Sequence, residues 1–120
     1  MNTWDELAER YVAVWNEPDA EARRRRIAEL WIEDGLHCTP SMEARGHAAL
    51  ERRIIGAWEK WVKGAGHSFR YAGDADSHHG GMKFHWEMRS PDDTLVSLGF
   101  DFLLIGADGR IAADYQFIER

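Results

Sequence analysis

The feature that most constrains the fold is a change in the spacing of apolar residues close to Gly66. Before Gly66 the apolar residues recur every three or four positions, as on one side of a helix. After it they alternate with polar residues, as in half-buried strands. Helices followed by consecutive strands favour an α+β fold, in which the helices cover one face of a curved, mostly antiparallel sheet. Because 120 residues is the size of one domain, we expect residues 1–120 to form a single domain.

Three helices are expected before Gly66. Thr3 and Glu6 form a capping box at the start of the first helix, and Pro18 prevents this helix from continuing. Gly35 is expected to end the second. The helices are predicted at residues 3–16, 20–33 and 47–62.

The remaining segments are predicted to be extended. Residues 36–45 contain Thr39-Pro40, and because proline cannot donate to a sheet ladder, this segment is at most an edge strand or a bulged hairpin. Turn sequences occupy residues 90–93 and 106–109. The later strands are predicted at residues 67–73, 82–88, 95–105 and 110–118.

Composition argues against several classes of function. The net charge is 15 − 21 = −6, which disfavours a nucleic-acid partner. No apolar run approaches the roughly 18 residues of a membrane span, and the N-terminus lacks the regions of a signal peptide. The single Cys38 cannot form an intramolecular disulfide, which agrees with a reducing compartment. We therefore expect a cytoplasmic protein that binds neither nucleic acid nor membranes.

Several short motifs occur in an order typical of one superfamily. They are Arg10-Tyr11-Val12-Ala13-Val14-Trp15-Asn16, Leu30-Trp31-Ile32-Glu33-Asp34-Gly35, Arg45-Gly46-His47-Ala48-Ala49-Leu50, Phe100-Asp101-Phe102 and Asp108-Gly109-Arg110-Ile111. With the order of elements, they resemble the cone-shaped nuclear transport factor 2-like fold of ketosteroid isomerases and SnoaL-like polyketide cyclases. The resemblance spans nearly the whole chain, and residues 114–119 resemble a bacterial subgroup with no assigned activity. It implies three helices on the concave face of a strongly bent sheet.

The resemblance to ketosteroid isomerases also implies site residues. Tyr11 and Asp101 match the tyrosine and the aspartic acid that bind the oxyanion in that family. The family's general base is an aspartate directly before a proline, whereas here Thr39 precedes Pro40. Because a threonine hydroxyl is a very weak base, steroid isomerisation by that route is not expected.

Strand alternation and the resemblance place further candidates beside Asp101. Asp114 and Gln116 are expected on the concave side of the last strand, and His37 shares the face of Thr39. Each candidate also has a structural interpretation, such as a core tyrosine or a loop histidine. The expected catalytic set is Tyr11, His37, Asp101 and Asp114, and the expected ligand-binding set is Trp15, Trp31, Thr39, Trp58, Phe84, Trp86, Leu103 and Gln116.

The histidines do not form a metal-binding motif in the sequence. His78 and His79 are adjacent, so on a strand they point to opposite faces, and no two histidines have the helical i, i+4 spacing of a zinc site. We expect neither a metal nor an organic cofactor.

Two functions remain open. The first is an enzyme that isomerises, cyclises or hydrolyses a small hydrophobic carbonyl compound by acid–base chemistry, with His37 or Asp114 as the base. The second is a non-catalytic module whose pocket binds a ligand or whose sheet docks another protein. Leu98, Phe100, Phe102 and Leu104 alternate with Asp101 and should form an apolar convex face, so a homodimer through this face is expected.

Overall fold

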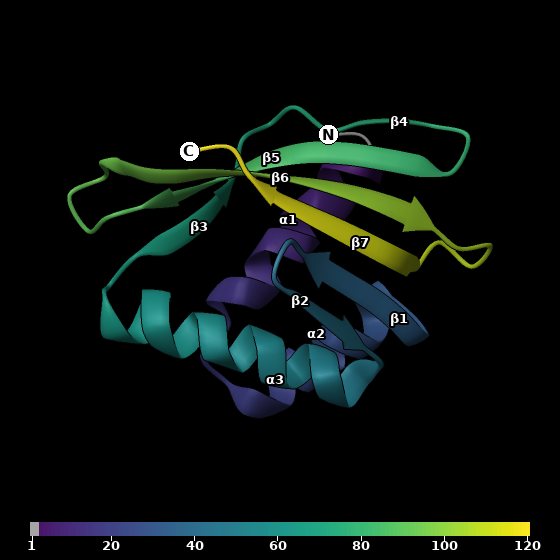
Figure 1. Cartoon of the computed structure of the whole chain (residues 1–120), viewed down its shortest axis with the longest axis horizontal. Coiled ribbons are helices and arrows are strands. Elements are labelled where there is room, and N and C mark those ends of the chain that lie inside the picture. Colours follow the sequence, from purple (N-terminus) through teal and green to yellow (C-terminus); the bar gives the residue numbers. More distant parts are fainter. Residues whose placement is uncertain (1–2) are drawn as a thin grey trace.

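The sheet is the largest element of the fold, and three helices lie on one side of it (Figure 1). The computed structural model describes residues 3–120. Seven strands pair in the order β2-β1-β7-β6-β5-β3, with β4 paired to β5, and β1 with β7 is the parallel pair. Three helices against one mixed, mainly antiparallel sheet confirm the predicted α+β cone-like fold. The strands are β1 (Trp31–Thr39), β2 (Met42–Arg45), β3 (Ser68–Tyr71), β4 (Asp76–His78), β5 (Gly81–Arg89), β6 (Leu95–Ile105) and β7 (Ile111–Ile118).

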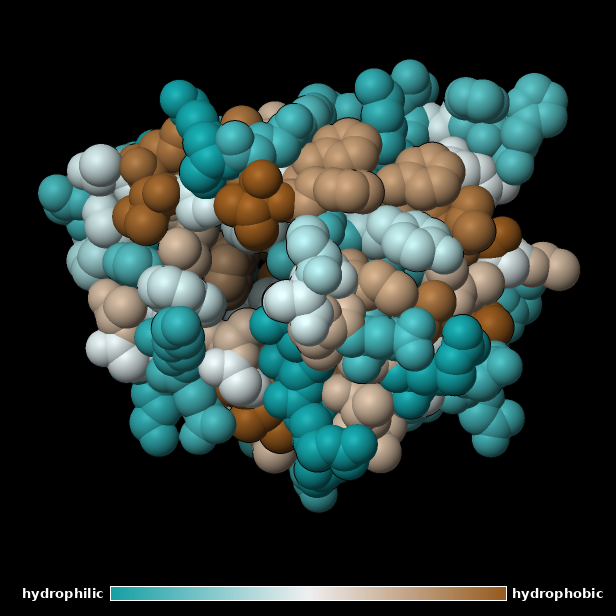
Figure 2. Space-filling model, viewed as in Figure 1, coloured by the Kyte–Doolittle hydropathy of each residue, from teal (hydrophilic) through white to brown (hydrophobic). Residues whose placement is uncertain are grey.

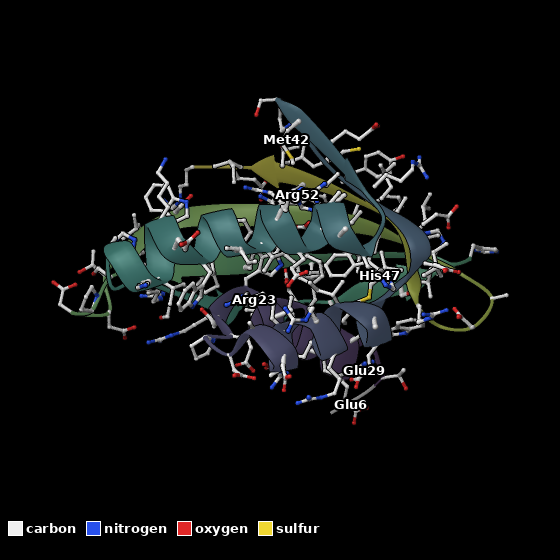
Figure 3. All side chains as sticks on the ribbon, turned by 90° about the horizontal axis from the view of Figure 1, so that it is seen from below. Glu6, Arg23, Glu29, Met42, His47 and Arg52 are labelled. Carbon is white, nitrogen blue, oxygen red and sulfur yellow. The ribbon has the colours of Figure 1, made fainter. Side chains whose placement is uncertain are left out.

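The helical half of the chain lies against the concave face of the sheet. Figure 3, which views the molecule from below, shows α2 and α3 side by side, with α3 in front of the strands and Arg23 between the two helices. The helices are α1 (Thr3–Asn16), α2 (Ala20–Leu30) and α3 (His47–Ala57), and α3 continues as the π-helix η1 (Trp58–Gly64). No helix in the described part of the chain is long and apolar enough to cross a membrane.

The prediction of a helix over residues 20–33 was wrong at its C-terminal end. Helix α2 ends at Leu30, and β1 begins at Trp31 and pairs with β7. Gly35 therefore lies inside β1 rather than at a helix end. A Cβ at this position would lie 2.8 Å from Cδ1 of Trp31, so the strand needs glycine there to pack against the buried indole. The burial of Trp31 and its pairing with β7 outweigh the helical spacing that suggested a longer helix.

Two other elements differ from expectation. The third helix was predicted as one helix over residues 47–62, but its α-helical part ends at Ala57 and η1 follows. Strand β4 was not predicted, because its three residues carry no apolar alternation. Residues 36–45 do form a hairpin, with β2 at the edge of the sheet.

The two faces of β6 differ in exposure as the alternation predicts. Asp101 and Leu103 are completely buried on the concave side, whereas Phe102 and Leu104 on the convex side are 37% and 42% exposed. The concave side packs against α1, whose buried residues include Leu7, Tyr11 and Val14. This packing brings polar groups of β1, β6 and β7 beneath α1.

Candidate functional site

Strand pairing brings the polar candidates together. His37 on β1 is the register partner of Asp114 on β7, and Asp114 pairs in turn with Leu103 on β6, two residues from Asp101. His37, Asp101 and Asp114 are all 0% exposed, and Tyr11 of α1 is 1% exposed. Four polar side chains from widely separated segments therefore meet inside the protein.

Tyr11 joins the two carboxyl groups. Its hydroxyl oxygen lies 2.9 Å from Oδ2 of Asp101 and 2.6 Å from Oδ2 of Asp114. A tyrosine hydroxyl has one hydrogen to donate, and an ionised carboxylate can only accept. Both contacts are hydrogen bonds only if one of the two carboxyl groups carries a proton and donates it to the Tyr11 oxygen.

Asp101 is the carboxyl group that holds this proton. Burial raises its pKa well above the usual range, and the negative charge of Asp114 raises it further. Burial also raises the pKa of Asp114, but hydrogen bonding within the cluster, including the bond from Tyr11, and the charge of Arg53 limit it to about 6. At neutral pH the cluster thus contains a neutral Asp101 and an ionised Asp114.

The contact with Trp86 shows which oxygen of Asp101 carries the proton. Its Nε1–H donates to Oδ1 of Asp101 at 2.7 Å, while Oδ2 of Asp101 donates to Tyr11. Tyr11 in turn donates to Asp114. Burial and the two carboxyl groups raise the pKa of Tyr11 well above its usual value, so the hydroxyl keeps its proton.

His37 and Arg53 lie at the other end of the cluster. Burial lowers the pKa of His37 to about 4, so the imidazole is neutral at pH 7. Nδ1 of His37 lies 2.7 Å from Oδ2 of Asp114 and donates to it, which leaves Nε2 to accept from Nε of Arg53 at 3.4 Å. Asp114, the anion of the cluster, therefore accepts hydrogen bonds from Tyr11 and from His37. Tyr11 in turn accepts from Asp101, and His37 accepts from Arg53.

His37, Asp101 and Asp114 also resemble a metal-ligand set, because one donor atom of each lies within 4.8 Å of the others. The same atoms, however, make the hydrogen bonds described above. A metal ion at this position would have to displace the proton of Asp101 and the Tyr11 hydroxyl. The hydrogen-bonded arrangement already accounts for every short contact in the cluster.

A cavity of about 610 Å³ opens next to the cluster. The surface is hollowed where the end of β7 faces α3 and the turn between β1 and β2 (Figure 2). Tyr11 separates the cavity from the carboxyl groups, since Tyr11 lines it but Asp101, Asp114 and His37 do not. The lining residues are Tyr11, Val12, Trp15, Thr39, Pro40, Ser41, Met42, Arg53, Ala57, Trp61, Phe69, Trp86, Met88, Val96, Ser97, Gln116 and Ile118.

Four of the eight predicted ligand-binding residues line this cavity: Trp15, Thr39, Trp86 and Gln116. The other four do not. Trp31, Phe84 and Leu103 are completely buried in the core, where the rings of Trp31 and Phe84 pack 5.6 Å and 5.2 Å from the ring of Tyr11. Their side chains do lie on the concave side, but α1 covers them.

Trp58 was also expected in the cavity wall, and this expectation was wrong. Its ring lies 5.1 Å from the Arg23 guanidinium and 5.8 Å from the Lys63 ammonium. Trp58 follows Ala57, which lines the cavity, and a step of one residue turns a helical side chain by about 100°. Trp58 therefore points toward α2.

Sequence reasoning missed several cavity residues, of which Arg53 and Trp61 matter most. Arg53, Ala57 and Trp61 are four residues apart and form one row along α3 and η1 that faces the cavity. An arginine in line with apolar residues was the available signal. Met42 and Phe69, from β2 and β3, also line the cavity.

The geometry defines a class of protein: a cone-shaped α+β fold with a cavity on the concave side of its sheet. Comparison with solved structures agrees. A SnoaL-like protein from Agrobacterium tumefaciens strain C58, whose name proposes an isomerase, superposes with a TM-score of 0.90 at 31% identity, covering 100% of both chains. The chain belongs to the SnoaL-like family.

More distant structures share the fold. A protein from Sinorhizobium meliloti, named as a candidate polyketide cyclase, superposes with a TM-score of 0.70 at 16% identity over 98% of this chain and 100% of its own. A Catenulispora acidiphila protein with a ketosteroid isomerase-like fold, in complex with trimethylamine, gives 0.71 at 12% identity over 96% and 86%. No protein-family model and no curated protein matches the sequence.

Proposed function

We propose that the cavity binds a small, largely apolar carbonyl compound, and that the protein catalyses its isomerisation, cyclisation or hydrolysis by acid–base chemistry without a cofactor. The observation that carries this proposal is the position of Tyr11, which lines the cavity and whose hydroxyl is hydrogen-bonded to both Asp101 and Asp114. The names of two structural neighbours propose an isomerase and a polyketide cyclase. Both reactions are compatible with proton transfer next to a carbonyl group.

Tyr11 is the group that would contact the ligand oxygen. Its hydrogen points to Asp114, and a ligand carbonyl would replace Asp114 as the acceptor. Asp101 would continue to donate to the Tyr11 oxygen, which strengthens Tyr11 as a donor. Negative charge that develops on the ligand oxygen would then be stabilised by donors already held in place.

Asp114 is the better candidate for the base. Its pKa of about 6 is close to neutral pH, whereas the pKa of His37 is lowered to about 4 and both of its ring nitrogens are in hydrogen-bonding contacts. Asp114 lies behind Tyr11, so we infer that protons reach it through the Tyr11 hydroxyl. Tyr11 would then serve as the link between the cavity and the buried anion. Because that hydroxyl has one hydrogen, Tyr11 donates to Asp114 in this relay and to the ligand oxygen in the role described above, so the two roles are alternatives.

The second candidate function is ligand binding without turnover. Among the described residues that line the cavity there is no carboxylate and no imidazole, so no base lies in direct contact with a ligand. Thr39, at the position of the base in ketosteroid isomerases, has only a hydroxyl group. This observation favours a binding module.

Hydrogen–deuterium exchange of a ketone separates the two functions. We would incubate 2-tetralone with the protein in D₂O and follow loss of the α-proton signals by NMR. Catalysis predicts exchange faster than in buffer and a loss of about 100-fold or more in both Tyr11→Phe and Asp114→Asn. Tyr115→Phe, which removes an exposed hydroxyl on the other face of the sheet, is the matched control. Binding without exchange would favour the binding module, and failure of 2-tetralone to bind would contradict a neutral ketone as the ligand.

We also propose that the protein is a homodimer through the convex face of the sheet. Phe100 and Phe102 on β6 pair with Phe117 and Tyr115 on β7, so these side chains share one face. Phe117 is 50% exposed and Tyr115 is 38% exposed. Apolar side chains gather over β6 and β7 in the upper half of Figure 2. A contiguous apolar surface of this kind is typical of protein interfaces.

A further inference from the structure

Arg53 is the charged side chain of the cavity wall. Of the described residues that line the cavity, it alone carries a full charge at neutral pH. Most of the remaining wall is apolar, with Trp15, Trp61, Phe69 and Met88 among its larger side chains. Arg53 is partly exposed, so water can hydrate the guanidinium in the open cavity, but a ligand that displaces this water must itself supply acceptors, because the apolar walls do not.

The contacts of Arg53 leave most of its hydrogen-bonding capacity unused. Nε donates to His37 at 3.4 Å, and the guanidinium lies 5.3 Å from the centre of the Trp15 ring. Within residues 3–120 no carboxylate oxygen lies within 4 Å of Arg53, whereas Arg24 and Arg26 pair with Glu51 and Glu17. The two terminal nitrogens of Arg53, which form the fork that binds a carboxylate, have no hydrogen-bond acceptor among residues 3–120.

This arrangement discriminates between neutral and anionic ligands. A neutral apolar ligand would expel water from Arg53 without offering an equivalent acceptor. A carboxylate would accept two parallel hydrogen bonds from the terminal nitrogens, and the pair would be stronger in the apolar cavity than in water. We propose that the physiological ligand is an organic anion, an apolar ring or chain with one carboxylate group that binds to Arg53. This inference rests on the proposed ligand-binding function of the cavity and adds the charge of the ligand.

A purely structural role for Arg53 is the competing explanation. Arg53 could serve only to offset the buried charge of Asp114, which lies on the other side of His37. In that case its removal would lower the stability of the protein but would not change which ligand it prefers. Ligand preference therefore separates the two roles.

The test compares 2-naphthoate with 2-naphthamide, which have the same ring system and differ in charge. Their dissociation constants for the wild-type protein would be measured by isothermal titration calorimetry at pH 7. We expect the carboxylate to bind about 10-fold or more tightly than the amide, the size expected for a hydrogen-bonded charge pair. Arg53→Gln should abolish the preference, and Arg53→Lys should retain part of it.

Arg52→Gln is the matched control, because Arg52 is the exposed neighbour of Arg53 on α3 and does not line the cavity (Figure 3). It should keep the wild-type preference. Equal affinity of both compounds for the wild-type protein, or a preference that survives in a folded Arg53→Gln variant, would overturn the inference. If Arg53→Gln does not fold, the affinities of the two compounds for the wild-type protein and for Arg53→Lys test the inference instead. Failure of both compounds to bind would instead contradict the ligand-binding function itself.

Discussion

Gly99 lies against the indole ring of Trp86, its register partner across β5 and β6. A Cβ atom at position 99 would lie 2.0 Å from Cζ2 of that ring, a distance that real atoms do not adopt. The missing side chain lets the indole lie against β6, from where Nε1 reaches Asp101 at 2.7 Å. Gly99 thereby positions a residue that is both a hydrogen-bond donor to the cluster and part of the cavity wall.

Gly99→Ala is expected to displace Trp86 and to destabilise the protein by about 1–3 kcal/mol, the usual range for overpacking a buried site. The measurement is urea unfolding followed by circular dichroism, together with the tryptophan emission spectrum. Gly56→Ala is the control, since a Cβ at this exposed position in α3 meets nothing within 4 Å. It should stabilise the protein by about 0.5–1 kcal/mol, because alanine favours a helix over glycine. Equal stability of the two variants would contradict the close contact.

Tyr11→Phe removes the hydroxyl that joins Asp101 to Asp114. Both carboxyl groups would lose a buried hydrogen bond, so we expect a loss of about 1–3 kcal/mol in the free energy of unfolding at pH 7. Tyr115→Phe, whose side chain is on the exposed convex face, should change it by less than about 0.5 kcal/mol. A Tyr11→Phe variant as stable as the wild type would show that the hydroxyl is not the bridge between the carboxyl groups.

Asp101→Asn should change how stability depends on pH. Because the pKa of Asp101 is raised in the folded state, its favourable contribution is complete below about pH 4 and is lost as the pH rises. Asn mimics the protonated carboxyl group: its amide can donate to Tyr11 and its oxygen can accept from Trp86. The variant should therefore gain stability relative to the wild type between pH 5 and 8, by at most about 1.4 kcal/mol per pH unit.

The pH profile of the wild-type protein alone would not assign this effect to Asp101, because two other buried groups titrate in the same range. The raised pKa of Asp114, about 6, makes stability fall as the pH rises from about 4 to 6, whereas the lowered pKa of His37, about 4, makes it rise between about pH 4 and 6.5. The two contributions offset each other. Urea unfolding at each pH should thus be compared between Asp101→Asn and the exposed control Asp34→Asn. Parallel curves for wild type and Asp101→Asn would contradict a protonated Asp101.

Phe117→Glu tests the proposed dimer. Phe117 is 50% exposed and its ring lies 6.1 Å from that of Phe100, so a carboxylate there would be buried in the interface. We expect sedimentation equilibrium to give a dimer for the wild type at concentrations of about 10–100 µM and a monomer for the variant. Glu29→Lys, which changes charge on α2 far from the convex face, should remain dimeric. A monomeric wild-type protein would refute the proposal.

The sequence predicts which side of a strand each residue occupies. It does not predict which of the residues on the concave side are covered by a helix. A period of two fixes which side of β6 Asp101 and Phe102 occupy, and both sides were predicted correctly. Whether a residue on the concave side faces the cavity depends on where α1 lies across the sheet. Phe84 and Trp86 are two residues apart in β5 and so lie on the same side of the sheet, yet α1 covers Phe84 and leaves Trp86 in the cavity wall. The end of α2 was mispredicted because Trp31 follows Ile27 and Leu30 at helical spacing and Gly35 was taken as the helix end. Trp31 instead begins β1 and pairs with Ile111, 80 residues later in the chain.

The parallel pairing of β1 with β7 determines when the cluster can assemble. Asp114 lies 77 residues after His37 and 103 residues after Tyr11, on the last strand of the fold to be synthesised. Until β7 docks, Tyr11 and His37 lack the anion that holds them, and β1 and β6 each present an open edge. Closing such distant contacts is slow compared with forming local ones. Gln116 and Ile118 of the same strand also line the cavity, so both the polar cluster and the cavity wall are incomplete until β7 pairs with β1 and β6.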